Sequence, residues 1–338
     1  MKLGIIFLSL LLFSAVPAQA EDAGLRFIQS RGYVICGTDL SSHTLAYKDK
    51  DGYWSGIDAD ICRNFAAAIF GNEDSFRLVN VPADRMATAL SNNQADIILG
   101  NATLSARQEI SSPAAAIDIL YYDRQVFASR QKTDATSMEA FKGAKVCVLD
   151  KSIDMANLNE YNHKYALEFK MLAFPNMDAA KQAFYLNRCD LISGSEIYLR
   201  GLTQSLVSKN NNVTVLPETI AYRPIYAYSI KSNPTLKIIG KWIINAPKLA
   251  EQQGITSKNA DAFIGVRDSS LKNLLGLDKS LWKAFGLQAE WVTPAIKRRG
   301  NFGEMYERNL GRESSLKIER NKNYLLDKGG LISAQPFI

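Results

Sequence analysis

Strand-like and helical runs alternate along most of the chain. Short runs rich in β-branched and aromatic residues are followed by longer runs with apolar residues at helical spacing. This alternation is typical of parallel strands joined by helical crossovers, and it predicts an α/β fold. Strands are predicted over residues 33–37, 76–81, 97–99, 145–149, 165–172 and 190–192. Helices are predicted over residues 58–70, 82–92, 155–165, 177–186, 236–252 and 270–275.

A glycine turn followed by a short amphipathic helix is predicted over residues 54–71. Asp58 stands where an N-cap is expected, because its carboxylate could accept hydrogen bonds from the free amides of the first turn. Apolar residues then recur at helical spacing, and Gly71 is expected to end the helix. Cys62 falls on the buried side of this helix. An ordinary surface helix of any α/β domain has the same pattern, so the segment alone does not define the class of protein.

The N-terminus has the pattern of a secretory signal peptide. Lys2 precedes an apolar run over residues 3–16, and the small residues Ala18 and Ala20 follow. The run is too short for a membrane helix, which needs about 20 apolar residues. Cleavage is therefore predicted after Ala20, with residues 1–20 removed and the mature protein exported.

Four cysteines in an exported chain predict two disulfides, and four cysteines allow three pairings. Cys36 ends a strand-like run and Cys62 lies on the helix that follows. Cys147 ends a second such run, and Cys189 precedes an apolar run. This symmetry favours Cys36 with Cys62 and Cys147 with Cys189. A zinc site is the alternative, but the chain has no Cys-x-x-Cys pair and only two histidines, so no metal site is predicted.

Composition and motifs argue against several function classes. Hydrophobic residues make up 47% of the 338-residue chain, which is enough for two cores. The net charge of +6 is mild, and the basic triplet at residues 297–299 has no aromatic platform beside it, so nucleic acid is not a predicted partner. No Gly-x-Ser-x-Gly or His-Glu-x-x-His motif is present, and the chain is not predicted to be an enzyme.

Several longer motifs carry a family resemblance. They are WSGIDADICR at residues 54–63, FKGAKVCV at 141–148, NRCD at 187–190, GITS at 254–257, GNFGEMYERNLG at 300–311, LK at 316–317 and KGGL at 328–331. With these motifs in this order, the chain resembles the periplasmic solute-binding proteins of ABC transporters. The resemblance is greatest to the general, broad-specificity L-amino-acid branch.

The resemblance implies a type II-like periplasmic binding protein with two α/β lobes. Each lobe would hold a mostly parallel sheet covered by helices, and a hinge would close the lobes around a solute in the cleft between them. Lobe one would comprise residues 21–130 and 224–338, and lobe two residues 131–223. The polar stretch over residues 129–136 is predicted to be a crossover or linker.

The resemblance also implies a function and its partners. A monomeric periplasmic protein would capture a small polar solute, amino-acid-like, and deliver it to an inner-membrane ABC permease without a cofactor. Two alternatives remain open. One is a divergent member whose amino-acid binding is altered or lost and which serves as a sensor or interaction module. The other is a dehydratase-like enzyme on the same fold.

The family's solute contacts can be placed on this chain, and several have changed. A zwitterionic amino acid needs an arginine or helix-start amides for its carboxylate and an acid for its ammonium group. Gly100 replaces the expected arginine, so Arg107 is the candidate carboxylate contact, with a solvated arginine as the alternative. Ser195 replaces the expected acid, and Ser152 keeps a hydroxyl that could equally be an N-cap. The predicted solute contacts are Asp39, Asn101, Thr103, Arg107, Ser152 and Ser195.

These changes affect solute contacts while the scaffold motifs persist. The protein is therefore predicted either to bind a solute other than an ordinary α-amino acid or to bind weakly. Free standard L-amino acids are predicted to bind less well here than to typical members of the family. The sequence leaves open whether His43 and Glu196 reach the cleft.

Overall fold

The computed structural model of the chain describes residues 23–41, 44–100, 103–130, 137–207 and 213–338. The predicted signal peptide at residues 1–20, His43 and Asn101 lie outside these ranges. No helix within the described ranges is long and apolar enough to cross a membrane.

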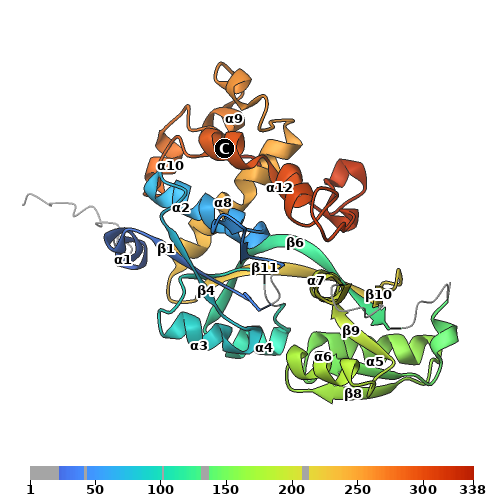
Figure 1. Ribbon diagram of the computed structural model, residues 1–338. Helices are drawn as coiled ribbons and strands as arrows, with labels where there is room; N and C mark the ends of the chain where they lie inside the picture. Colours follow the sequence, from blue (N-terminus) through green and yellow to red (C-terminus); the bar gives the residue numbers. More distant parts are fainter. Residues whose placement is uncertain (1–22, 42–43, 101–102, 131–136, 208–212) are drawn as a thin grey trace, which may run out of the picture.

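A nine-stranded mixed sheet runs through both lobes in the order β4-β1-β5-β11-β6-β9-β7-β8, with β10 also paired to β6 (Figure 1). Its strands are β1 (Val34–Thr38), β4 (Phe76–Asn80), β5 (Ile97–Ile98), β6 (Ala114–Ser129), β7 (Lys145–Leu149), β8 (Lys170–Phe174), β9 (Leu191–Ser195), β10 (Thr214–Val215) and β11 (Ala221–Ile230). Strand β1 is parallel to β4 and β5, and β7 is parallel to β8 and β9. Strands β2 (Tyr47–Lys48) and β3 (Trp54–Ser55) form a separate antiparallel pair. The predicted α/β class with mostly parallel sheets is confirmed.

Two long antiparallel strands, β6 and β11, connect the lobes. They pair from Ala221 opposite Gln125 to Ile230 opposite Ala114, with two register shifts on the way. Ser129, where the sequence predicts a crossover or linker to begin, is instead the buried last residue of β6. The crossing is therefore made by paired strands, because the main-chain groups of β6 and β11 bond to one another. Residues 131–136 of the predicted linker lie outside the described ranges.

Helices cover the sheet in both lobes. They are α1 (Ala23–Arg31), α2 (Ile57–Phe70), α3 (Met86–Ser91), α4 (Ala106–Ser111), α5 (Ile153–Tyr165), α6 (Met177–Tyr185), α7 (Glu196–Val207), α8 (Pro234–Gln252), α9 (Ser269–Leu274), α10 (Ser280–Ala284), α11 (Val292–Arg299) and α12 (Phe302–Asn309). Helices α9, α10 and α12 gather on the side of α2 and α8, away from α5 and α6 (Figure 1). The C-terminal third of the chain thus packs with the N-terminal third.

Two predicted boundaries are wrong. The helix predicted over residues 82–92 is divided into a 3-10 turn, Ala83–Arg85, and the short helix α3. The strand predicted from residue 165 begins only at Lys170, because Ala166 has a left-handed conformation (φ 49°) that ends α5.

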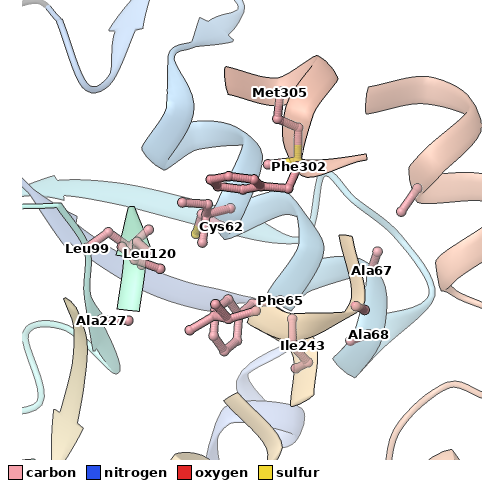
Figure 2. Close-up of a cluster of buried hydrophobic side chains, with 14 of the residues drawn as sticks. Cys62, Phe65, Ala67, Ala68, Leu99, Leu120, Ala227, Ile243, Phe302 and Met305 are labelled. Carbon is pink, nitrogen blue, oxygen red and sulfur yellow. The ribbon is translucent and has the colours of Figure 1, made fainter. Parts of the chain in front are cut away.

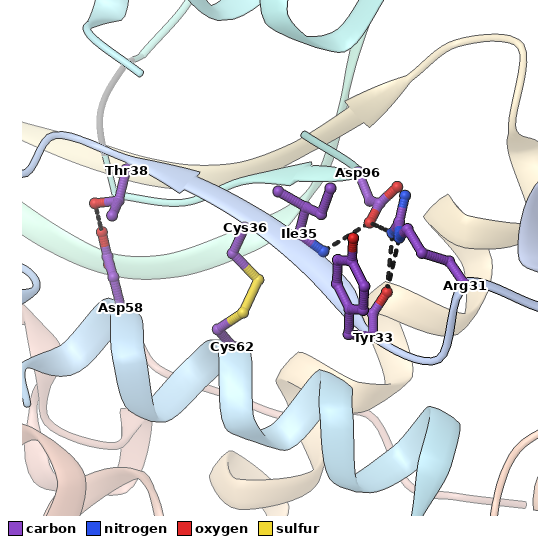
Figure 3. Close-up of a disulfide and its surroundings, with 8 residues drawn as sticks. All are labelled: Arg31, Tyr33, Ile35, Cys36, Thr38, Asp58, Cys62 and Asp96. Carbon is purple, nitrogen blue, oxygen red and sulfur yellow. Dashed lines mark hydrogen bonds and ion pairs between the residues drawn. A yellow bond between two sulfur atoms is a disulfide. The ribbon is translucent and has the colours of Figure 1, made fainter. Parts of the chain in front are cut away.

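Helix α2 keeps its predicted end but not its predicted cap. Gly71 has a left-handed conformation (φ 72°), and its N–H donates to the carbonyl of Ala67. At the other end Gly56 precedes the first helical residue, Ile57, and gives no side-chain cap. Asp58 is fully buried one residue further on, where its carboxylate accepts a hydrogen bond from the Thr38 hydroxyl (Figure 3). The predicted N-cap role of Asp58 is wrong, because its side chain is directed at strand β1.

Buried side chains form separate cores in the two lobes. The largest core joins α2, α8 and α12, where Phe65, Ile243 and Phe302 pack together with Cys62 and Met305 (Figure 2). A smaller cluster lies around α3 and β5. Two further clusters belong to residues 126–216 alone, one on each face of that part of the sheet. This arrangement gives each lobe its own apolar interior.

The structure contains both disulfides that the symmetry of the sequence favours. Cys36 of β1 is bonded to Cys62 of α2, with Cα atoms 6.2 Å apart (Figure 3). Cys147 of β7 is bonded to Cys189, with Cα atoms 5.7 Å apart. Each bridge therefore joins a strand to another segment of the same lobe: Cys62 lies on α2, and Cys189 lies in the connection between α6 and β9.

Candidate functional site

A cavity of about 510 Å³ lies between the lobes. One wall is built from residues 39, 41, 44, 45, 80, 82–85, 100 and 103, and the other from residues 149, 154, 175–178, 195, 197 and 198. The crossing strands β6 and β11 contribute Tyr121, Asp123, Arg223 and Ile225. The volume lies within the range of about 300–1,000 Å³ that is usual for small-molecule sites.

Three of the predicted solute contacts meet at this cavity. Asp39 lines it and accepts hydrogen bonds from the main-chain N–H and the hydroxyl of Ser41. The Thr103 hydroxyl donates to the carbonyl of Pro224 over 2.6 Å. Ser195 lies at the end of β9, where its hydroxyl accepts from the N–H of Tyr198 over 3.1 Å.

The other predicted contacts lie elsewhere. Arg107 is exposed on helix α4 and does not line the cavity. Ser152 is also outside the lining, because it caps α5 by accepting from Met155 N–H while its hydroxyl donates to the carbonyl of Leu149. Glu196 faces away from the cavity and is held by Arg124 and Arg200. The structure thus gives Arg107 and Ser152 the alternative roles of exposed side chain and N-cap.

A buried charged group at the floor of the cavity is absent from the sequence predictions. Arg223 of β11 donates to Asp154 over 2.7 Å and to Asp123 over 2.6 Å. Asp123 comes from β6 and Asp154 from the first turn of α5, so the group joins three elements. These residues are far apart in the sequence and share no local motif. The pairing of β6 with β11 places Arg223 opposite Asp123, and the start of α5 brings Asp154 to them.

Burial and charge compete within this group. Burial raises the pKa of Asp154, and the neighbouring Arg223 guanidinium opposes that rise. Burial also lowers the pKa of Arg223, but the carboxylates of Asp154 and Asp123 more than reverse this and raise it above its usual value. Arg223 therefore stays charged, and its two terminal nitrogens are both occupied.

Two tyrosine hydroxyls on the cavity wall have no hydrogen-bond partner among the described residues. Tyr121 is only 1% exposed, and burial raises the pKa of its hydroxyl well above the usual value. Burial also raises the pKa of Tyr198. A buried hydroxyl without a partner is costly, so a polar group brought against either oxygen would be stabilised there.

Gly100 and Asp58 fit together beneath the cavity wall. Gly100 has a positive φ of 60°, and a Cβ atom there would lie 2.4 Å from Asp58 Oδ2. A side chain at position 100 would thus displace the carboxylate. Burial raises the pKa of Asp58 from 3.8 to about 7, although the Thr38 hydrogen bond lowers it and the charge of Asp39 raises it further.

Asp58 is expected to make stability depend on pH around neutrality. Because its folded pKa exceeds its unfolded value, the folded state holds an extra proton, and the stability this contributes is fully present below pH 4 and is lost as pH rises through 7. Between pH 5 and pH 8, the wild-type free energy of unfolding should fall by about 2 kcal/mol relative to Asp58→Asn. Urea unfolding at both pH values measures the difference.

Asp51→Asn, a change at an exposed turn residue, is the control and should keep the wild-type pH dependence. A parallel pH dependence of wild type and Asp58→Asn would contradict a raised pKa at Asp58.

Comparisons with known proteins agree with the fold and the cavity. Residues 34–311 match the family described as bacterial extracellular solute-binding proteins, family 3. The protein YhdW of Escherichia coli K12 is 31% identical over 95% of each chain. The general L-amino acid-binding periplasmic protein AapJ of Rhizobium johnstonii is 30% identical, also over 95% of each chain.

A solved structure shows the same architecture. A periplasmic binding protein from Brucella ovis with glutathione bound superposes with a TM-score of 0.84 at 30% identity, covering 93% of this chain and 99% of that one. The match extends across both lobes. The chain therefore belongs to the bacterial extracellular solute-binding proteins, family 3.

Proposed function

We propose that this protein is the periplasmic solute receptor of an ABC importer for a small polar solute, amino-acid-like. The observation that carries the proposal is the cavity of about 510 Å³ whose walls come from both lobes. The names of the relatives, which include an amino-acid ABC transporter-binding protein and a general L-amino acid-binding protein, support capture for transport over a sensor or a dehydratase-like enzyme. We accordingly assign the protein no catalytic step.

Closure of the lobes would complete the site. We place lobe one at residues 21–130 and 224–338 and lobe two at residues 131–223, with β6 and β11 as the connection between them. Hinge closure around a ligand changes the backbone of a few connecting residues. The register shifts in the β6–β11 pair, beside Ile225 and Ala227, are candidate positions for that bending. Closing would exclude water and strengthen each polar contact to the solute.

The solute contacts that we retain are Asp39, Thr103 and Ser195, joined by Tyr121 and Asp154. The amino-acid-binding residues expected from the family are altered here, and ordinary L-amino acids should bind less well than they do to typical members. The mature chain would begin after Ala20, act as a monomer and present its closed form to the permease.

Solute binding should be visible as stabilisation of the mature protein. A solute present at 100 times its dissociation constant is expected to raise the free energy of unfolding by about 2.7 kcal/mol. A thermal-shift screen with amino acids, dipeptides, glutathione, polyamines and organic acids, followed by calorimetry, measures this. A screen without any stabilising solute would contradict a receptor role.

Tyr121→Phe separates solute binding from folding. It removes only a hydroxyl that has no hydrogen-bond partner among the described residues, so the stability of the unliganded protein should be unchanged or slightly higher. The solute-induced shift should shrink, because Tyr121 lines the cavity and we expect lobe closure to bring its hydroxyl against the solute. An unchanged shift would remove Tyr121 from the site.

A further inference from the structure

We propose that the cavity selects a solute of net positive charge, an organic ammonium or guanidinium compound, over neutral and anionic ones. The inference rests on the proposed function of the cavity as the solute site. It assigns the selection to Asp39 and Asp154, assisted by Tyr121 and Tyr198.

The charges on the described cavity lining do not balance. Five aspartates line the cavity against two arginines. The lining aspartates are Asp39, Asp84, Asp123, Asp154 and Asp178. Asp84 lies 4.0 Å from Arg85 at the exposed rim, and Lys181 donates to Asp178 over 2.8 Å from outside the lining. Asp123 and Asp154 share a single cation, and no ion pair joins Asp39 to a described residue. Two negative charges therefore remain in excess on the described lining.

Few cationic side chains in the interior of this cavity can pair with a solute carboxylate. Both terminal nitrogens of Arg223 are occupied by Asp123 and Asp154, which leaves only its buried Nε without a partner among the described residues. The other arginine of the lining, Arg85, is 73% exposed at the rim. Arg107, the sequence candidate for carboxylate binding, lies outside the lining. An anion at the floor would meet carboxylates whose only counter-charge is already shared, which disfavours it electrostatically.

The second observation concerns two buried tyrosine hydroxyls on the cavity wall. The hydroxyls of Tyr121 and Tyr198 both lack one among the described residues. A tyrosine hydroxyl oxygen can accept from an N–H group, and tyrosine rings attract cations over their faces. After burial, the charges that raise the pKa of Tyr198 include those of Asp178 and Asp39, so this hydroxyl lies near lining acids. The wall thus combines carboxylates with two tyrosines whose hydroxyls have no partner among the described residues.

Asp154 has one carboxylate oxygen without a hydrogen-bond partner among the described residues. Its Oδ1 receives the hydrogen bond from Arg223, whereas no described residue donates to its Oδ2. A carboxylate that already binds one guanidinium can accept further hydrogen bonds through its second oxygen. A solute N–H group at this point would complete the network.

Matched solutes test the charge preference directly. Calorimetry of the mature protein compares L-arginine, agmatine and L-citrulline, which have similar shapes and different charges, and adds glutathione as a net-anionic solute. Arginine or agmatine is expected to bind at least about tenfold more tightly than citrulline, because a charge-assisted hydrogen bond is replaced by a neutral one. If agmatine binds more tightly than arginine, the solute is an amine without a carboxylate. If arginine binds more tightly than agmatine, the solute is a basic amino acid.

Different results would contradict the charge preference and the receptor role. Citrulline or glutathione binding as tightly as the cations would overturn the charge preference while leaving the receptor role intact. The absence of binding by any solute in the broader screen would instead overturn the receptor role, and the preference with it.

Variants locate the preference on named residues. Asp39→Asn and Asp154→Asn should each weaken binding of the preferred cation about tenfold, since each removes a charge beside the solute and keeps the oxygen that bonds to Ser41 or Arg223. Asp51→Asn makes the same change at an exposed turn residue and should alter affinity less than about twofold. Equal losses of affinity in all three variants would show an effect of general surface charge. That result would overturn the assignment of the preference to Asp39 and Asp154. Asp39→Asn alone still decides the test if Asp154→Asn does not fold.

Discussion

Arg223→Met is expected to lower the free energy of unfolding by about 3–5 kcal/mol. Arg223 is the shared partner of two buried carboxylates, Asp123 and Asp154, and its loss leaves both without a counter-charge. The cost comes from the uncompensated charges that remain, since an intact buried ion pair itself adds little stability. Urea unfolding monitored by circular dichroism gives the difference from wild type.

The control is another arginine in an ion pair. Arg200 bonds to Glu196, but Glu196 keeps Arg124 when Arg200 is lost, so Arg200→Met should cost no more than about 1 kcal/mol. Adding Asp123→Asn and Asp154→Asn to Arg223→Met should restore much of the lost stability, because the unpaired charges are removed. Equal losses in Arg223→Met and Arg200→Met would show that the buried group is not a shared charge network.

Replacing Cys147 and Cys189 together with alanine is expected to cost about 4 kcal/mol. The bond closes a loop with a sequence separation of 42, and the chain-entropy estimate for that length gives this value. The same change at Cys36 and Cys62, with a separation of 26, should cost about 3.5 kcal/mol. Alanine avoids placing a hydroxyl in these fully buried positions. Urea unfolding under oxidising conditions measures both.

A reducing agent provides the control for the disulfides. Dithiothreitol should lower the melting temperature of the wild type and leave the variant lacking all four cysteines unchanged. The unfolded wild type should be reduced by dithiothreitol. If the wild type nevertheless melts at the same temperature with and without reductant, a stabilising role for the disulfides is contradicted.

The scaffold was predictable wherever a local pattern determines the structure. Gly71 ends α2 because a left-handed residue there costs glycine little, and this signal is visible in the sequence. The cysteine pairs were predictable because each half of the chain has one cysteine at the end of a strand-like run and a second cysteine further along. Strand β6 was missed because its 16 residues are mostly buried or half-buried, so no clear alternation of polar and apolar residues marks it.

The site was less predictable, because its chemistry depends on residues that only the fold brings together. Asp123 and Arg223 are 100 residues apart and meet through the pairing of β6 with β11. Asp58 shows a related limit: an aspartate near a helix start suits both an N-cap and a buried hydrogen bond. The nearby Thr38 decides between them, and its proximity is a property of the tertiary structure.

The strand order also has a consequence for how the chain acquires its structure during synthesis. Strands β7, β8 and β9 are close in sequence and can pair early. Strand β5, in contrast, pairs with β11 through Ile98 and Tyr228. The edge of β5 that faces β11 therefore stays unpaired until β11 has emerged. Contacts between distant segments form slowly, and apolar surface exposed meanwhile promotes aggregation. Phe65 packs in the same core as Phe302, so this core cannot form before Phe302 has emerged. The N-terminal third of the chain is therefore the part most in need of a chaperone before folding is complete.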